Sequence, residues 1–139
     1  MRVKRLHQIT GLLVVIIFLL TGQYMDLYYR HMEGVDDGMR MMFRSRHIYL
    51  LLAGLLNIGI GSYFSYRAEQ WRKALQLAGS VLVLVAPFVL LLAFFREPTL
   101  ANLQRPFTLP AIVALLTGTL LHLLSGLRQK SELAARSIE

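Results

Sequence analysis

The stretch from Tyr24 to Tyr49 holds the densest set of residues that could carry chemistry, including five of the six methionines. Thioether sulfur is a soft ligand suited to Cu(I), and imidazole can complete such a site. A copper site here would draw on Met25, His31, Met32, Met39, Met42 and His47. The alternative is that these methionines fill a membrane interface, because their unbranched side chains adapt to irregular contacts.

The same stretch carries arginines at helical spacing. Arg40, Arg44 and His47 follow one another at intervals of four and three residues, and Arg46 is next to His47. Such intervals place side chains on one helix face. A guanidinium grips carboxylate or phosphate with two parallel hydrogen bonds. We therefore predict that Arg40, Arg44, Arg46 and His47 bind an acidic ligand or partner. The alternative is that Asp36 and Arg40 form a local ion pair. The remaining arginines would then bind lipid headgroups or the loop carboxylates Asp26, Glu33 and Glu97.

Two further histidines stand near the ends of apolar runs on the same expected side of a membrane. His7 precedes the first run and His122 lies within the last. Together they would provide axial ligands for a b-type haem or a hydrogen-bonding pair for a quinone head group. Arg128 would then be available for an acidic substituent. The alternative is that His7 lies at headgroup level and His122 bonds a neighbouring helix.

Familiar catalytic signatures are missing from the chain. There is no G-x-S-x-G, H-E-x-x-H, phosphate-binding loop or G-x-G-x-x-G, and no carboxylate interrupts an apolar run. Cysteine is absent, which excludes a thiolate metal site and a cysteine nucleophile. These absences favour a protein that is not an enzyme. The net charge of +7 is divided among separate loops, so we expect no nucleic acid as a partner.

Four apolar runs must position these residues. They cover residues 8–22, 48–64, 74–95 and 109–127, and no charged side chain interrupts them. With their flanks they reach roughly 25 to 33 Å as helices, which matches the ~30 Å hydrocarbon core of a bilayer. Lipid offers no hydrogen bonds to a backbone, so helices are the structure expected for such runs.

We therefore predict an all-α integral membrane protein with one domain over residues 1–139. Its four transmembrane helices, at about 7–25, 47–66, 74–95 and 109–127, would form an up-down-up-down bundle, because the later connections are short. The loop of residues 26–46 would end in a helical extension of the second span, with Asp36 as its N-cap.

The cations predict the orientation of this bundle. If the amino terminus is cytoplasmic, that side collects nine Lys and Arg residues against three Glu, whereas the other side has six Arg against five acidic residues. Because Lys and Arg are retained in the cytoplasm, both termini should lie there, with the protein in the inner (plasma) membrane. The residues after the first run lack a small-residue cleavage site, so we expect an uncleaved anchor.

Small and polar residues mark the expected helix contacts. Gly54, Asn57 and Gly61 would form a seam on the second span, and Gly118 would do so on the fourth. Helices in lipid associate through close packing at small residues and through polar contacts. Pro87 should kink the third span and leave room beside the carbonyl of Val83.

Three functions are compatible with these features. The leading hypothesis is an accessory, assembly or scaffold component that acts by association with membrane lipids and with another membrane protein or a second copy. The first alternative is a redox protein that holds haem or quinone at His7 and His122. The second alternative is an extracytoplasmic component that handles copper through its Met and His residues.

Overall fold

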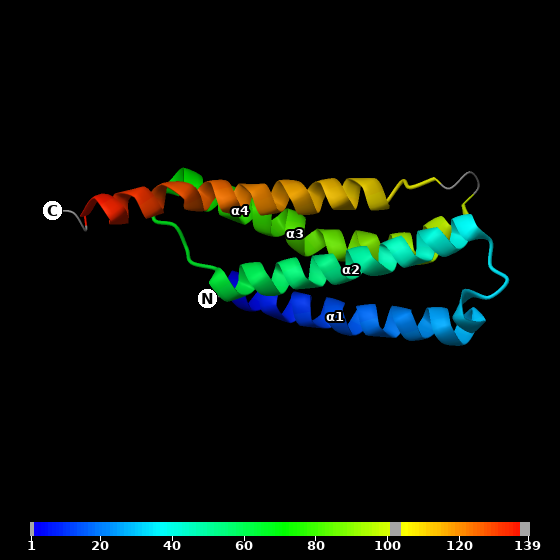
Figure 1. Cartoon of the computed structure of the whole chain (residues 1–139). Coiled ribbons are helices and arrows are strands. Elements are labelled where there is room, and N and C mark those ends of the chain that lie inside the picture. Colours follow the sequence, from blue (N-terminus) through cyan, green and yellow to red (C-terminus); the bar gives the residue numbers. More distant parts are fainter. Residues whose placement is uncertain (1, 101–103, 137–139) are drawn as a thin grey trace.

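The computed structural model describes residues 2–100 and 104–136, with side chains up to Gly126, and these residues form helices and no strand. The elements are α1 (Arg2–Tyr28), η1 (Arg30–Met32), α2 (Asp37–Tyr63), α3 (Gln70–Arg96), η2 (Glu97–Thr99) and α4 (Thr108–Arg136). Figure 1 shows that each α-helix runs antiparallel to the one before it in the sequence. The start of α1 and the end of α4 lie at one end, here called the terminal end. The α1–α2 and α3–α4 connections lie at the other, here called the loop end.

Three segments of the described chain are long and apolar enough to cross a membrane. They are Arg2–Tyr28, Gln70–Thr99 and Thr108–Gly126. The fourth helix, α2, is also 27 residues long, but arginines occupy its first turns and Asn57 and several glycines interrupt its apolar part. The prediction of a helical bundle is confirmed. The crossing of α2 and the orientation of the bundle stay predictions.

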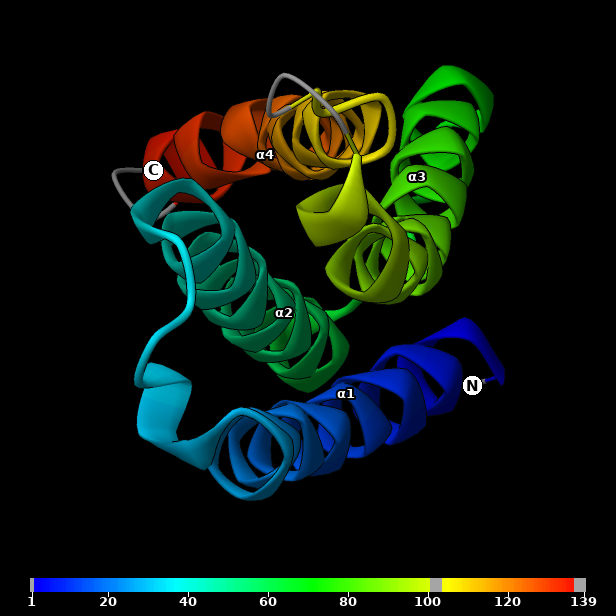
Figure 2. The ribbon, with the colours of Figure 1, turned by 90° about the vertical axis from the view of Figure 1, so that its right-hand side faces the viewer.

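The helices pack as two hairpins. α1 lies along α2 and α3 lies along α4, and the two hairpins meet mainly through α2 and α3. Figure 2 shows this arrangement along the bundle, with α1 and α4 on opposite sides. Large apolar side chains cover the outside, as at Leu12, which is 59% exposed. A surface of this kind suits lipid rather than water.

Glycines bring the paired helices into close contact. A Cβ atom added at Gly11 would lie 2.8 Å from the carbonyl oxygen of Gly54, and one added at Gly79 would lie 2.7 Å from that of Gly118. The predicted seam residues Gly54 and Gly118 therefore lie at contacts within the chain, between α1 and α2 and between α3 and α4. Such contacts are the main means by which helices associate in lipid.

The loop between α1 and α2 ends where the sequence places the start of a helix. The Asp36 carboxylate accepts hydrogen bonds from the backbone N–H groups of Gly38, at 2.9 Å, and Met39, at 3.3 Å. It thus caps α2, which begins at Asp37, before the predicted span. Earlier in the loop, η1 is a turn of left-handed backbone, with φ between 44° and 66° at Arg30, His31 and Met32.

Candidate functional site

Asn57 connects three helices at the centre of the bundle. Pro87 in α3 has no N–H, so the carbonyl of Val83 lacks its usual donor within the helix. The side-chain amide of Asn57 donates to that carbonyl at 3.0 Å and to the carbonyl of Ala53 at 2.9 Å. Both amide protons are thereby used. The Asn57 Oδ1 atom is left to face α1, and the residue is fully buried.

The remaining oxygen of Asn57 lies against His7 of α1. The His7 Nδ1 atom lies 2.8 Å from Asn57 Oδ1, which can only accept, so Nδ1 carries the proton. The other nitrogen, Nε2, is then a bare acceptor. His7 is fully buried, and Nε2 has no hydrogen-bond partner among the described residues. The site therefore contains a fixed imidazole tautomer whose lone pair is unused.

His122 of α4 lies beside His7. The two ring centroids are 5.9 Å apart and the rings meet nearly edge to face, at 80°. Phe64, the first residue after α2, has its ring 6.2 Å from that of His7 and 5.9 Å from that of His122. His122 Nε2 also lies 3.2 Å from the hydroxyl oxygen of Ser80 in α3. The two histidines that the sequence singled out thus meet at the terminal end.

Two glycines make room for these rings. A Cβ atom added at Gly61 would lie 3.1 Å from the His7 Cβ atom, and one added at Gly79 would lie 3.1 Å from the His122 Cδ2 atom. The seam glycines therefore serve the polar site as well as helix packing. The sequence places Gly79 and Ala86 on one face of the third span, and in the structure Gly79 lies at the contact with α4.

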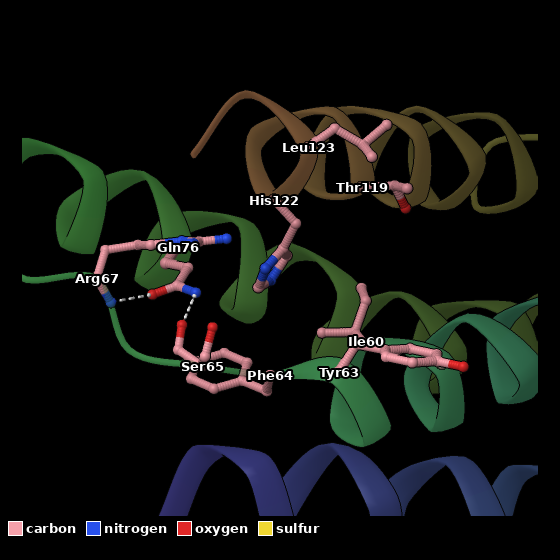
Figure 3. Close-up of a pocket in the computed structure, with 10 residues that line it drawn as sticks. Ile60, Tyr63, Phe64, Ser65, Arg67, Gln76, Thr119, His122 and Leu123 are labelled. Atoms are coloured by element: carbon pink, nitrogen blue, oxygen red, sulfur yellow. Dashed lines mark hydrogen bonds between the residues drawn. The ribbon is translucent and has the colours of Figure 1, made fainter. Parts of the chain in front are cut away.

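A cavity of about 250 Å³ opens next to His122 at the terminal end. Its lining comes from the end of α2, the link to α3, the start of α3, and α4. The lining residues are Gly59, Ile60, Tyr63, Phe64, Ser65, Arg67, Gln76, Thr119, His122 and Leu123. Figure 3 shows His122 pointing from α4 toward the link. Gln76 fixes the link, because its amide donates to the Ser65 carbonyl at 2.7 Å and accepts from the Arg67 N–H at 3.4 Å.

The size of this cavity limits what it can hold. Pockets for drug-sized ligands measure roughly 300–1,000 Å³. A cavity of about 250 Å³ suits a single substituted ring better than a porphyrin. His7 is not among the residues that line it, although His7 contacts the rings of both His122 and Phe64, which do. Of the two cofactors considered for His7 and His122, haem and quinone, the quinone head group fits this volume better.

The predicted cationic face is not formed as one open surface. Arg46 is fully buried, and its Nε donates to Glu97 Oε2 at 2.6 Å. His47 points into the contact between α1 and α2, where its Nδ1 lies 3.0 Å from the Thr21 hydroxyl oxygen and its ring stacks on Phe18. Helical spacing gives the direction of a side chain around its own helix, but it does not say which neighbouring helix covers that direction.

The two other members of the set differ in their surroundings. Arg40 donates to the Val35 carbonyl at 3.1 Å and lies 3.5 Å from Asp37 across one helical turn. Arg44 is exposed. An anion or partner would therefore meet Arg44 and part of Arg40 at the loop end, and binding by all four residues stays a prediction.

Glu97 is one of the three loop carboxylates that the sequence offered as partners of the arginines, and in the structure it pairs with Arg46. Its carboxylate is fully buried and accepts from the backbone N–H groups of Phe107, at 2.6 Å, and Thr108, at 2.8 Å, as well as from Arg46. It therefore caps the start of α4 while it pairs with α2. The available signal was its place directly after an apolar run, on the same expected side as Arg46.

The predicted copper ligands are divided between two places. Met25, His31 and Met32 line a cavity of about 220 Å³ at the loop end together with Asp26 and Arg44. His31 also contacts the Asp26 carboxylate. Met42 is fully buried, and Met39 packs against the core. Within residues 2–100 and 104–126, no three His, Cys, Asp or Glu side chains are grouped so as to hold a metal ion. Copper binding stays a prediction.

Arg128, the residue expected to meet an acidic substituent near His122, lies beyond the described side chains. No family model, no curated protein and no solved structure matches this chain.

Proposed function

We propose that this chain is a four-span inner-membrane protein that binds the ring of a lipid-soluble quinone in the cavity beside His122. The observation that carries the proposal is the cavity itself. It is lined by apolar side chains, such as Ile60 and Leu123, and by His122, and the buried His7 ring lies against that of His122. Aromatic ring binding needs flat apolar surface and a few directed hydrogen-bonding groups.

The position of the cavity also supports a ligand that arrives through lipid. Tyr63 and Leu123 line it and are 90% and 58% exposed on the outside of the bundle. These side chains would face the acyl region or the interface if α2 and α4 cross the membrane. A quinone carries an isoprenoid tail that partitions into that region, and its ring would enter between the two helices.

Binding of a short-chain benzoquinone to the purified full-length protein tests the proposal. Equilibrium dialysis in detergent should show saturable binding. His122→Leu should weaken it about tenfold, or ~1.4 kcal/mol, because one buried hydrogen bond is lost. Gly59→Leu should weaken it as well, because Gly59 lines the cavity and its Cβ position has no described atom within 4 Å, so the added side chain has room there and fills ligand space.

His31→Leu is the matched control, because His31 is exposed at the opposite end of the bundle. It should bind the benzoquinone as tightly as the unaltered protein does. Absence of saturable binding, or equal affinity of His122→Leu and the unaltered protein, would show that the cavity does not have this function.

The arrangement of α2 supports the fourth crossing. α2 packs along both α1 and α3, which are long and apolar enough to span. A helix that packs along two spanning helices shares their depth. Its polar groups suit that depth, because Arg46 and Asn57 are bonded inside the bundle. Polar groups at membrane depth generally need such partners.

A second proposal is association with another membrane protein, as an accessory or assembly component. Its support is the exposed guanidinium of Arg44 at the loop end, beside the partly open Arg40. Arg44→Glu should abolish cross-linking to such a partner in intact membranes, whereas Arg2→Glu at the terminal end should leave the cross-link unchanged. An unaltered cross-link in Arg44→Glu would exclude this surface.

A further inference from the structure

His7 Nε2 is a buried hydrogen-bond acceptor without a donor among the described residues, and this affects whether an oxidised or a reduced ligand binds more tightly. Asn57 fixes the proton on Nδ1, because both of its own amide protons are held by the Ala53 and Val83 carbonyls. Nε2 therefore offers a lone pair and nothing to donate. It is completely shielded and lacks a donor among the described residues. A buried acceptor left unpaired costs about 1–3 kcal/mol.

Phe64 and His122 both line the ligand cavity and both lie against the His7 ring. The Phe64 ring also lies against that of His122. Phe64 is the C-cap of α2, and its ring also lies 5.0 Å from that of Tyr66. A ligand hydroxyl would reach His7 if the Phe64 ring turned about its side-chain bonds, which needs no change in the helices.

We propose that the site prefers the hydroquinone form of its ligand, because His7 Nε2 accepts a hydrogen bond from a ligand hydroxyl. This inference rests on the proposed quinone binding and adds the redox state to it. A quinone carbonyl has no proton and leaves Nε2 unpaired. A hydroquinone hydroxyl supplies the missing donor. No electron or proton is transferred in this step; only the affinity of the two forms differs.

The expected preference is about tenfold, equivalent to one buried hydrogen bond of ~1.4 kcal/mol. By linkage, a tenfold preference for the reduced form raises the midpoint potential of the bound two-electron couple by about 30 mV relative to the free couple. Two independent readouts therefore exist, one from dissociation constants and one from potential.

The experiment compares a short-chain benzoquinone with its hydroquinone on the full-length protein. The unaltered protein should bind the hydroquinone about tenfold more tightly. His7→Phe keeps an aromatic ring but has no acceptor, so it should bind both forms equally and with the affinity of the quinone. The matched control is His47→Phe, which removes an imidazole from the loop end and should keep the preference.

A second probe protects the test against a His7 variant that does not fold. The hydroquinone dimethyl ether has the same ring but no hydroxyl proton, and it should bind the unaltered protein about tenfold more weakly than the hydroquinone. Equal binding of quinone, hydroquinone and ether by the unaltered protein would overturn the inference while leaving quinone binding intact. Failure of all three to bind would overturn the proposed function itself.

Discussion

Among the side chains that the structure describes, that of Glu97 accepts an unusually large number of hydrogen bonds. It accepts hydrogen bonds from Arg46 in α2 and from two backbone N–H groups at the start of α4, and the Thr108 hydroxyl donates to it as well. A buried carboxylate needs this many donors, because removal from water is expensive for a charge. The pair therefore connects α2 to the end of α3 and to the start of α4.

Loss of Arg46 should be strongly destabilising. Arg46→Met keeps the length of the side chain but leaves the Glu97 charge buried with two backbone donors and a hydroxyl. We expect the free energy of unfolding to fall by about 3–5 kcal/mol, the usual cost of an uncompensated buried charge. Thermal unfolding in detergent, followed by circular dichroism, would measure it. Arg44→Met, two residues earlier and exposed, should change stability by less than about 1 kcal/mol.

Sequence reasoning identified several polar residues but not all of their partners. His7 and His122 were expected at the same end, and the structure places their rings side by side. The Asn57 bond to His7 was not predicted, because it depends on how α1 and α2 are rotated against each other. Local spacing does not determine that rotation. Glu97 was underestimated for the same reason, since its burial arises only when α2, α3 and α4 are assembled.

The close contacts between paired helices depend on the positions of glycines. Gly118 faces α3, and a Cβ atom added there would lie 2.6 Å from the Val83 Cγ2 atom and 2.8 Å from the Gly79 carbonyl oxygen. Gly59 occupies a comparable interior position in α2, with no described atom within 4 Å of an added Cβ. The two residues form a matched pair, because both carry the same helix propensity and only one is in a close contact.

Gly118→Ala should lower the free energy of unfolding by about 1–3 kcal/mol, because the added methyl group forces α3 and α4 apart. Gly59→Ala should leave stability unchanged or raise it by up to about 1 kcal/mol, because alanine is the better helix former. Both values come from the same unfolding measurement. A Gly118→Ala protein as stable as Gly59→Ala would contradict the close α3–α4 contact.

The helices themselves were largely predictable. Uninterrupted apolar runs can satisfy their backbone only as helices in lipid, so length and composition were sufficient for α1, α3 and α4. The start of α2 at Asp37 also followed from its capping aspartate. The left-handed turn at Arg30–Met32 did not, because successive positive φ angles in residues other than glycine have no local sequence signal.

The loop end and the terminal end of the molecule are expected on opposite sides of the membrane, and this can be tested. The chain has no cysteine, so single cysteines can be introduced without a background signal. In intact cells, a membrane-impermeant maleimide should label Glu33→Cys in the first loop and leave Ala68→Cys in the α2–α3 link unlabelled until the cells are opened. Both positions are exposed in the structure. Labelling of both cysteines in intact cells would mean that α2 does not cross.

The cavity is lined by both α2 and α4, and this affects which ligand concentration, in lipid or in water, determines binding. If the protein binds a quinone as proposed, a molecule that enters between α2 and α4 is drawn from the bilayer. Its occupancy is then determined by its mole fraction among the lipids rather than by its aqueous concentration. Diluting a loaded sample with buffer should then leave the ligand bound. Diluting it with empty vesicles should strip the ligand away.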